Sequence, residues 1–256
     1  MHLNKLFSIA LNTYRESVRD KIFYTFFAFS IIIIGLSFYL GRLSIGESRK
    51  ILLDVSFGTM SVIGTLVSVF VGISLVYREI ERKTIYNILS KPIGRGEVVI
   101  GKFLGLSTAL VLMEIQMFAM MVVLMFLQGH PININLFPAF FSILCEIELI
   151  LAFAVIFSTM SSPILSGIFT IAFYIVGNIS HSIYDLYRLS SESVGWVLQI
   201  LYYVLPDFNK FNFRAHALYN IPIEVPHLFL SFCYVILYLT ILLKFAIVVF
   251  EKKDLE

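Results

Sequence analysis

Six long, mainly apolar runs alternate with shorter polar pieces along this chain of 256 residues. The runs cover residues 22–40, 56–77, 98–127, 136–160, 164–180 and 226–250. A helix of roughly 20 apolar residues is long enough to cross the hydrocarbon core of a membrane. The pattern therefore predicts an all-α polytopic membrane protein with six transmembrane helices, in which residues 1–256 form a single transmembrane domain.

The first 21 residues have a different pattern. Apolar side chains recur there at helical spacing, and polar ones fill the other face; the apolar set is Leu3, Leu6, Phe7, Ala10, Leu11, Tyr14 and Val18. Such a pattern also occurs in soluble amphipathic helices. Because the first apolar run follows immediately, residues 1–21 are predicted to form an amphipathic helix in the membrane interface.

Basic residues are unevenly distributed between the two sides of the predicted bundle. Residues 78–97 form a polar loop, and six of the 19 Lys and Arg residues lie between Tyr77 and Lys102. With both termini on the same side as this loop, that side carries 13 of the 19, and the other side carries six. Since basic loops stay in the cytoplasm, the distribution predicts a multi-pass protein with both termini cytoplasmic.

The longest piece on the other side is 181–225. Within it, residues 194–205 are apolar and aromatic but too short to span a membrane. This pattern predicts a short interfacial or re-entrant helix in an otherwise extracytoplasmic region.

Composition agrees with a membrane protein. The chain is 59% hydrophobic and 14% charged, whereas soluble domains are about 25% charged. Cys145 and Cys233 both lie in apolar runs and do not indicate a disulfide or a metal site. The bilayer, and not nucleic acid, is the expected partner of so apolar a surface.

Motifs of catalysis are weak. Gly96 to Lys102 has the spacing of a phosphate-binding loop, but Phe103 stands where Ser or Thr must bind magnesium. His181 and Asp185 miss the spacing of the acyltransferase pattern, and the five His residues lack metal-ligand spacing. We expect no catalytic, cofactor or metal site in this chain.

Three acidic residues, Glu114, Glu146 and Glu148, lie inside predicted spans. An ionised carboxylate costs about 2.5–3.5 kcal/mol at the centre of a membrane helix, so such residues are functional candidates. They could belong to a polar translocation path or a proton-linked site. They could equally make hydrogen bonds between helices, with or without a bound proton, or stand at the edge of a span that begins deeper than the apolar run indicates. Glu146 and Glu148 lie about 200° apart around a helix, so they cannot both face one cavity.

The polar loop contains a short helical pattern over residues 79–90. Thr84, Ile85, Ile88 and Leu89 form an apolar stripe, and Glu79 and Glu81 stand near the expected start of the helix. Pro92, Gly94 and Gly96 end the pattern. A half-apolar helix in water needs a cover, which is either the lipid surface or a groove on a soluble partner.

This loop resembles that of type 2 ABC (ATP-binding cassette) transporter permeases. The shared pattern is E-x-x-T-x-x-x-x-L-S-x-P-I-x-R-x-E-x-x-x-G-K, which here consists of Glu81, Thr84, Leu89, Ser90, Pro92, Ile93, Arg95, Glu97, Gly101 and Lys102. Lys83 stands where similar permeases more often have Gly. The N-terminal helix, six spans and an L-P-D-x-x-x-F stretch from Leu205 to Phe211 extend the resemblance over nearly the whole chain.

The resemblance implies a permease subunit of an exporter in a bacterial or archaeal cytoplasmic membrane. Such subunits pair with a second copy or a paralogue and bind two cytoplasmic ATPase subunits, which carry the ATP and magnesium. The helix in 78–97 would be the coupling helix, and its ATPase-coupling residues would be Glu81, Arg82, Thr84, Ile85, Ile88, Leu89, Pro92, Arg95 and Glu97.

The resemblance also suggests where a substrate would pass. The second and fifth spans line the path in similar transporters, so Gly64, Gly72 and Tyr174 join the three acids as path candidates. Small residues in a span can equally serve helix packing. The alternative function is a membrane scaffold or an acyltransferase-like membrane enzyme whose loop recruits a cytoplasmic partner.

Overall fold

The computed structural model describes residues 2–43, 46–81, 94–189 and 206–252, together with residues 196 and 199. Within these residues the chain is helical, and it contains no strand. The prediction of an all-α polytopic membrane protein is confirmed.

Six helices are long and apolar enough to cross a membrane, as predicted. They are α2 (Lys21–Leu43), α3 (Ser48–Glu81), α5 (Arg95–Leu127), α6 (Leu136–Met160), α7 (Pro163–Leu189) and α10 (Val225–Lys252). The amphipathic helix α1 (His2–Val18) precedes them. Two short elements, η1 (Phe208–Phe211) and α9 (Arg214–Tyr219), lie between α7 and α10.

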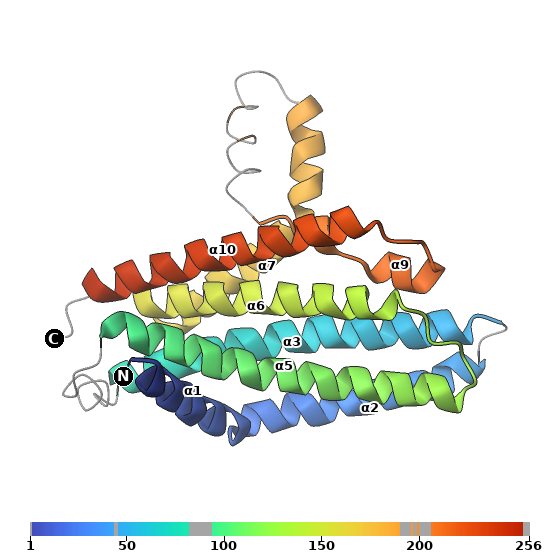
Figure 1. Cartoon of the computed structure of the whole chain (residues 1–256), viewed down its shortest axis with the longest axis horizontal. Helices are drawn as coiled ribbons and strands as arrows, with labels where there is room; N and C mark the ends of the chain where they lie inside the picture. The colour runs from blue at the N-terminus through green and yellow to red at the C-terminus, as the bar shows by residue number, and fades with distance from the viewer. Residues whose placement is uncertain are drawn as a thin grey trace.

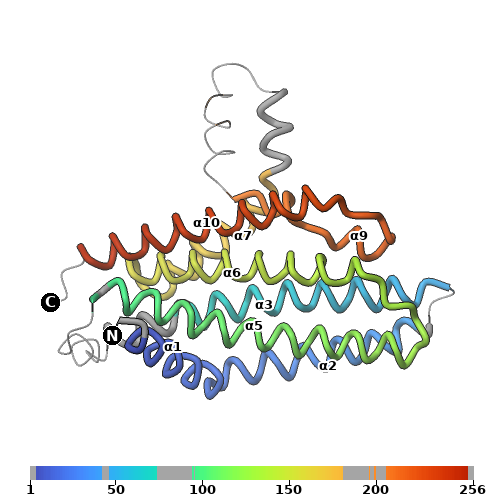
Figure 2. Tube along the Cα trace, in the orientation of Figure 1, coloured from blue at the N-terminus to red at the C-terminus, as the bar shows by residue number. Residues whose placement is uncertain are grey.

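The helices run back and forth along one axis, with α3 and α6 in the middle (Figure 1). These two helices are largely buried, whereas less than a quarter of the apolar stretch is buried in α2, α7 and α10. The start of α5 and the end of α10 lie at the end of the bundle where α1 begins (Figure 2). The bundle therefore has one end with both described termini and an opposite end with α9.

Two helices extend beyond the predicted spans. Helix α3 begins at Ser48 instead of residue 56, because Leu52 and Leu53 are completely buried among neighbouring helices. It continues through Glu81, so Glu79 and Glu81 end α3 instead of beginning a separate helix. Helix α7 likewise continues to Leu189. The rest of the predicted coupling helix and most of 194–205 lie outside the described residues.

Helix α5 has 33 residues, about 50 Å at the rise of an α-helix, which exceeds the thickness of a hydrocarbon core. Its first turns pack against other helices through glycine. Gly96 contacts Ile247 of α10, and Gly101 contacts Ile9 of α1. The sequence with phosphate-loop spacing is therefore helical, and its glycines serve helix packing.

The face that α1 turns toward α5 overlaps only in part with its predicted apolar face. Thr13 and Ser17 are buried, whereas Phe7 is 66% exposed. Gly105 of α5 lies directly against the Ala10 carbonyl and Thr13. Small residues allow this close approach of two helices, and the exposed apolar side chain of Phe7 remains for contact with lipid.

Polar side chains join three connections at the end of the bundle opposite the termini. The Arg49 guanidinium donates to the carbonyls of Ala217 and Leu218 and to the side chain of Asn220. The Asn220 side chain also accepts from Asn133 at 2.8 Å. These bonds tie the start of α3, the α5–α6 connection and the end of α9 together.

His130 lies in the same region and makes a 3.1 Å contact with the Ser48 hydroxyl. Burial, and then the charge of Arg49, lower the pKa of His130 below its usual value. A histidine of this kind stabilises the fold above its unfolded pKa and loses that contribution as the pH falls. The melting-temperature advantage of the wild type over His130→Gln should therefore shrink between about pH 8 and about pH 5. A constant difference over that range would contradict the lowered pKa of His130.

Candidate functional site

An ion pair inside the bundle is the centre of the candidate site. Arg214, the first residue of α9, donates to a carboxylate oxygen of Glu146 on α6 at 2.8 Å. The hydroxyl of Ser61 on α3 donates to the same oxygen at 3.2 Å. The Glu146 side chain is only 7% exposed. The pair thus joins a short connecting helix to the two central helices.

Aromatic residues hold Arg214 in place. Phe208, Phe211 and Phe213 precede it and are all buried. The Asp207 side chain accepts from the backbone N–H of Asn209 and begins η1, and the Asn212 side chain accepts from the backbone N–H of Arg214. The chain is therefore anchored in the bundle immediately before the arginine.

Glu114 of α5 lies close to this pair but is not part of it. Its side chain is completely buried, and within the described part of the chain neither of its oxygens has a hydrogen-bond partner. Glu146 and Arg214 both act on it electrostatically. A Cβ atom added at Gly64 would lie 2.6 Å from the Glu114 Oε1 atom. The carboxyl is thus enclosed against the backbone of α3.

Glu148 faces elsewhere. Its carboxylate accepts from the hydroxyl of Ser107 on α5 at 2.8 Å, whereas Glu146 faces Ser61 and Arg214. The prediction that Glu146 and Glu148 cannot share a cavity agrees with these separate partners.

The other path candidates occupy two kinds of position. Gly64 packs against Ile147 of α6, and a Cβ at Gly72 would lie 2.8 Å from Ala154 on the same helix. Tyr174 of α7 lies beside Ser61 and Thr65 of α3 and interacts with Glu146. Both glycines therefore pack α3 against α6. Tyr174 belongs to the polar cluster that Glu146, Arg214 and Ser61 form. Their role in a substrate path stays a prediction.

The predicted coupling residues fall mostly outside the described chain, which omits Arg82, Thr84, Ile85, Ile88, Leu89 and Pro92. Glu81 is the last residue of α3, and Arg95 is the first of α5. Glu97 lies in the first turn of α5, where its carboxylate accepts from the backbone N–H of Gly94 at 3.2 Å. The assignment of these residues to coupling stays a prediction.

Sequence reasoning missed Arg214 and Ser61. Arg214 is 68 positions from Glu146, and no spacing rule relates the two residues. The L-P-D-x-x-x-F stretch from Leu205 to Phe211 lies close to Arg214 in the sequence, but it does not indicate what the arginine contacts. Ser61 is an ordinary small residue within an apolar span.

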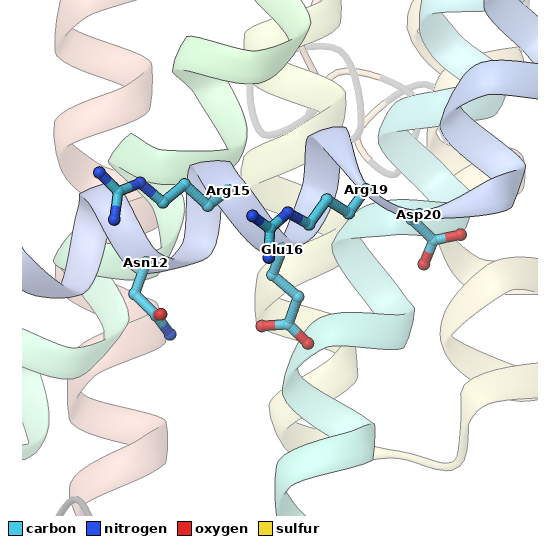
Figure 3. A pocket seen from close by; sticks show the side chains of 5 residues that line it. All are labelled: Asn12, Arg15, Glu16, Arg19 and Asp20. Atoms are coloured by element: carbon cyan, nitrogen blue, oxygen red, sulfur yellow. The ribbon is translucent and has the colours of Figure 1, made fainter.

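Two pockets lie near charged side chains. A small one of about 10 Å³ is lined by Glu146, Arg214 and neighbours including Asn178, which is about the space that one water needs. An open one of about 580 Å³ is lined by Asn12, Arg15, Glu16, Arg19 and Asp20 at the junction of α1 and α2 (Figure 3). The second pocket has two arginines and two carboxylates, and Asp20 accepts from the backbone N–H of Ile22. Its balanced charge selects neither an anion nor a cation.

Metal-ligating side chains do not gather. No group of three His, Cys, Asp or Glu residues able to hold a metal ion occurs in the described ranges. Cys145 is buried in α6, Cys233 is exposed on α10, and both are free thiols.

Comparison with known proteins agrees with the architecture. No curated protein matches the chain. A family model described as ABC-2 family transporter protein matches residues 7–255, which is nearly the whole sequence and includes all six membrane-length helices. With this match over a bundle of apolar helices, the chain belongs to the ABC-2 family of transporter proteins, and it is a multi-pass membrane protein.

Proposed function

We propose that this chain is the permease subunit of an ATP-driven exporter, with ATP hydrolysed by separate cytoplasmic ATPase subunits. The family match over residues 7–255 is the observation that carries the proposal. In the full complex, two permeases, either identical or paralogous, bind two ATPases, and the ATPases hold ATP and magnesium. The substrate passes between the two permeases.

The helix arrangement supports coupling through the connection between α3 and α5. Residues 82–93 join the end of α3 to the start of α5. Helix α3 packs against α2, α5, α6, α7 and α9, so a displacement at its end reaches most of the bundle. Helix α1 packs on the first turns of α5 and would move with them.

The charge distribution supports a cytoplasmic position for this connection. The end of α3 and the start of α5, which it joins, lie at the end of the bundle where α1 begins and α10 ends (Figure 1), and that side carries 13 of the 19 Lys and Arg residues. Both termini would then be cytoplasmic, beside the ATPases.

The proposal predicts that a charged residue placed in the apolar stripe of residues 84–89 prevents the ATPase from binding. In native membranes, Leu89→Asp and Ile85→Asp should each reduce the ATPase that co-purifies with the permease by tenfold or more, because burying an unpaired carboxylate in an apolar groove costs several kcal/mol. Quantitative mass spectrometry of the purified complex, together with its ATP hydrolysis rate, measures the effect.

A matched control is Asn87→Asp, which adds the same charge to the opposite face of the expected helix and should retain the ATPase. Retention of the ATPase by both stripe variants would refute coupling through residues 84–89. Absence of any ATPase from the wild-type complex would refute the permease assignment itself.

A further inference from the structure

Glu114 is more completely enclosed than the neighbouring ionisable residues Glu146 and Arg214. It is 0% exposed, whereas Glu146 is 6% exposed and is paired with Arg214. The small pocket beside that pair is lined by Glu146 and Arg214 but not by Glu114. Glu114 is therefore more completely enclosed than the ion pair, and it does not line the small pocket beside that pair.

The surroundings of Glu114 do not compensate a negative charge. The Glu114 carboxyl lies against Gly64 of α3, beside Ile147 of α6. Among the described residues, the charged groups that act on it are Glu146, which repels a carboxylate, and Arg214, which attracts one. Arg214 is already bonded to Glu146. Tyr174 lies beside Ser61 and Thr65 and interacts with Glu146.

An ionised carboxylate in such a position costs far more than a neutral acid. A hydrogen bond between helices, the alternative explanation for a buried acid, is not made, because both Glu114 oxygens lack a partner among the described residues. A carboxyl that is enclosed without a partner and next to a second carboxylate is stable there only with a proton bound.

We propose that Glu114 is a proton-binding site, which holds its proton while α3, α5 and α6 are packed together. Release of the proton breaks the carboxyl O–H bond, leaves the electron pair on the carboxylate, and passes the proton to water. We assign that water to the water-sized pocket lined by Glu146 and Arg214, the two charged groups that act on Glu114. The carboxylate that remains requires either separation of α3 from α5 and α6 or transfer of Arg214 from Glu146 to Glu114.

The proposal links proton binding to helix packing. Conditions that remove the proton favour an opened bundle, and opening by any other cause favours release of the proton. This linkage concerns the chain itself and does not depend on an ATPase or on a substrate, so its test is separate from that of the permease function.

Infrared spectroscopy of the full chain in lipid nanodiscs tests the site. At neutral pH, the difference spectrum of wild type minus Glu114→Gln should contain the carbonyl band of one protonated carboxylic acid, shifted to lower frequency in D₂O. Wild type minus Glu146→Gln is the matched control, because it removes an ion-paired acid from the same bundle. That difference should contain carboxylate bands instead.

A second variant distinguishes loss of the Glu114 carboxyl from misfolding of the protein. Glu114→Met replaces a neutral acid by an apolar residue of similar size, so it should fold and melt within a few degrees of wild type. It should lose the same carbonyl band. Persistence of the band in both variants, or loss of carboxylate bands instead, would overturn the proposal.

Discussion

Arg214→Gln should destabilise the protein more than any single surface substitution. The change leaves Glu146 buried in α6 without its cationic partner, and leaving one charge of a buried pair uncompensated costs about 3 kcal/mol. For a chain of this size that cost corresponds to a melting temperature lower by roughly 10 °C. Thermal unfolding in detergent or nanodiscs measures it.

Two further variants isolate the ion pair as the cause. The double variant Glu146→Gln/Arg214→Gln removes both charges and should recover most of the lost stability. Lys50→Gln breaks the exposed pair between Lys50 and Glu47, 2.9 Å apart, and should cost no more than about 1 kcal/mol. If Arg214→Gln melts at the same temperature as Lys50→Gln, the ion pair does not hold α9 to α6.

Gly105→Ala should release α1 from α5. A Cβ atom there would collide with the backbone carbonyl of Ala10 and lie 2.6 Å from the Thr13 Cβ. Because the obstructing atom belongs to the backbone, a side-chain rotation cannot relieve the collision, and α1 must move as a whole. Overpacking of this kind costs about 1–3 kcal/mol, so we expect a lower melting temperature and faster proteolysis within residues 2–18.

Gly58→Ala is the matched control for this prediction. A Cβ at Gly58 meets no heavy atom within 4 Å, and Ala is favoured over Gly in a helix by about 1 kcal/mol. This variant should be as stable as the wild type or slightly more stable. Equal melting temperatures and equal proteolysis for the two variants would show that α1 does not depend on its contact with Gly105.

The membrane-length helices could be located from the sequence because their length is a local property. Helix α6 spans Leu136–Met160 as predicted, since the hydrocarbon core demands a minimum apolar length whatever the neighbours are. The separation of Glu146 from Glu148 was also predictable, because it follows from the angle per residue of a helix. The extension of α3 to Ser48 was missed because Leu52 and Leu53 are buried by other helices.

The candidate site was only partly predictable. Intramembrane Glu114 and Glu146 stand out because ionisable residues are rare in apolar spans. The sequence did not show that one of these acids has a charged partner and the other has none. One acid pairs with Arg214, 68 positions away, and the other lies without a partner against Gly64. The positions of η1 and α9 in the bundle determine which of the two acids forms the ion pair with Arg214.

The six spans, the amphipathic first helix, the charge asymmetry and the family resemblance follow from the order of the residues alone. The contacts between helices follow from packing, including the docking of α1 on α5 through Gly101 and Gly105 and the enclosure of Glu114 beside an ion pair. The reason is physical. In a membrane protein both lipid-facing and buried surfaces are apolar, so hydrophobicity does not tell them apart. Small residues and polar pairs distant in sequence select the contacts.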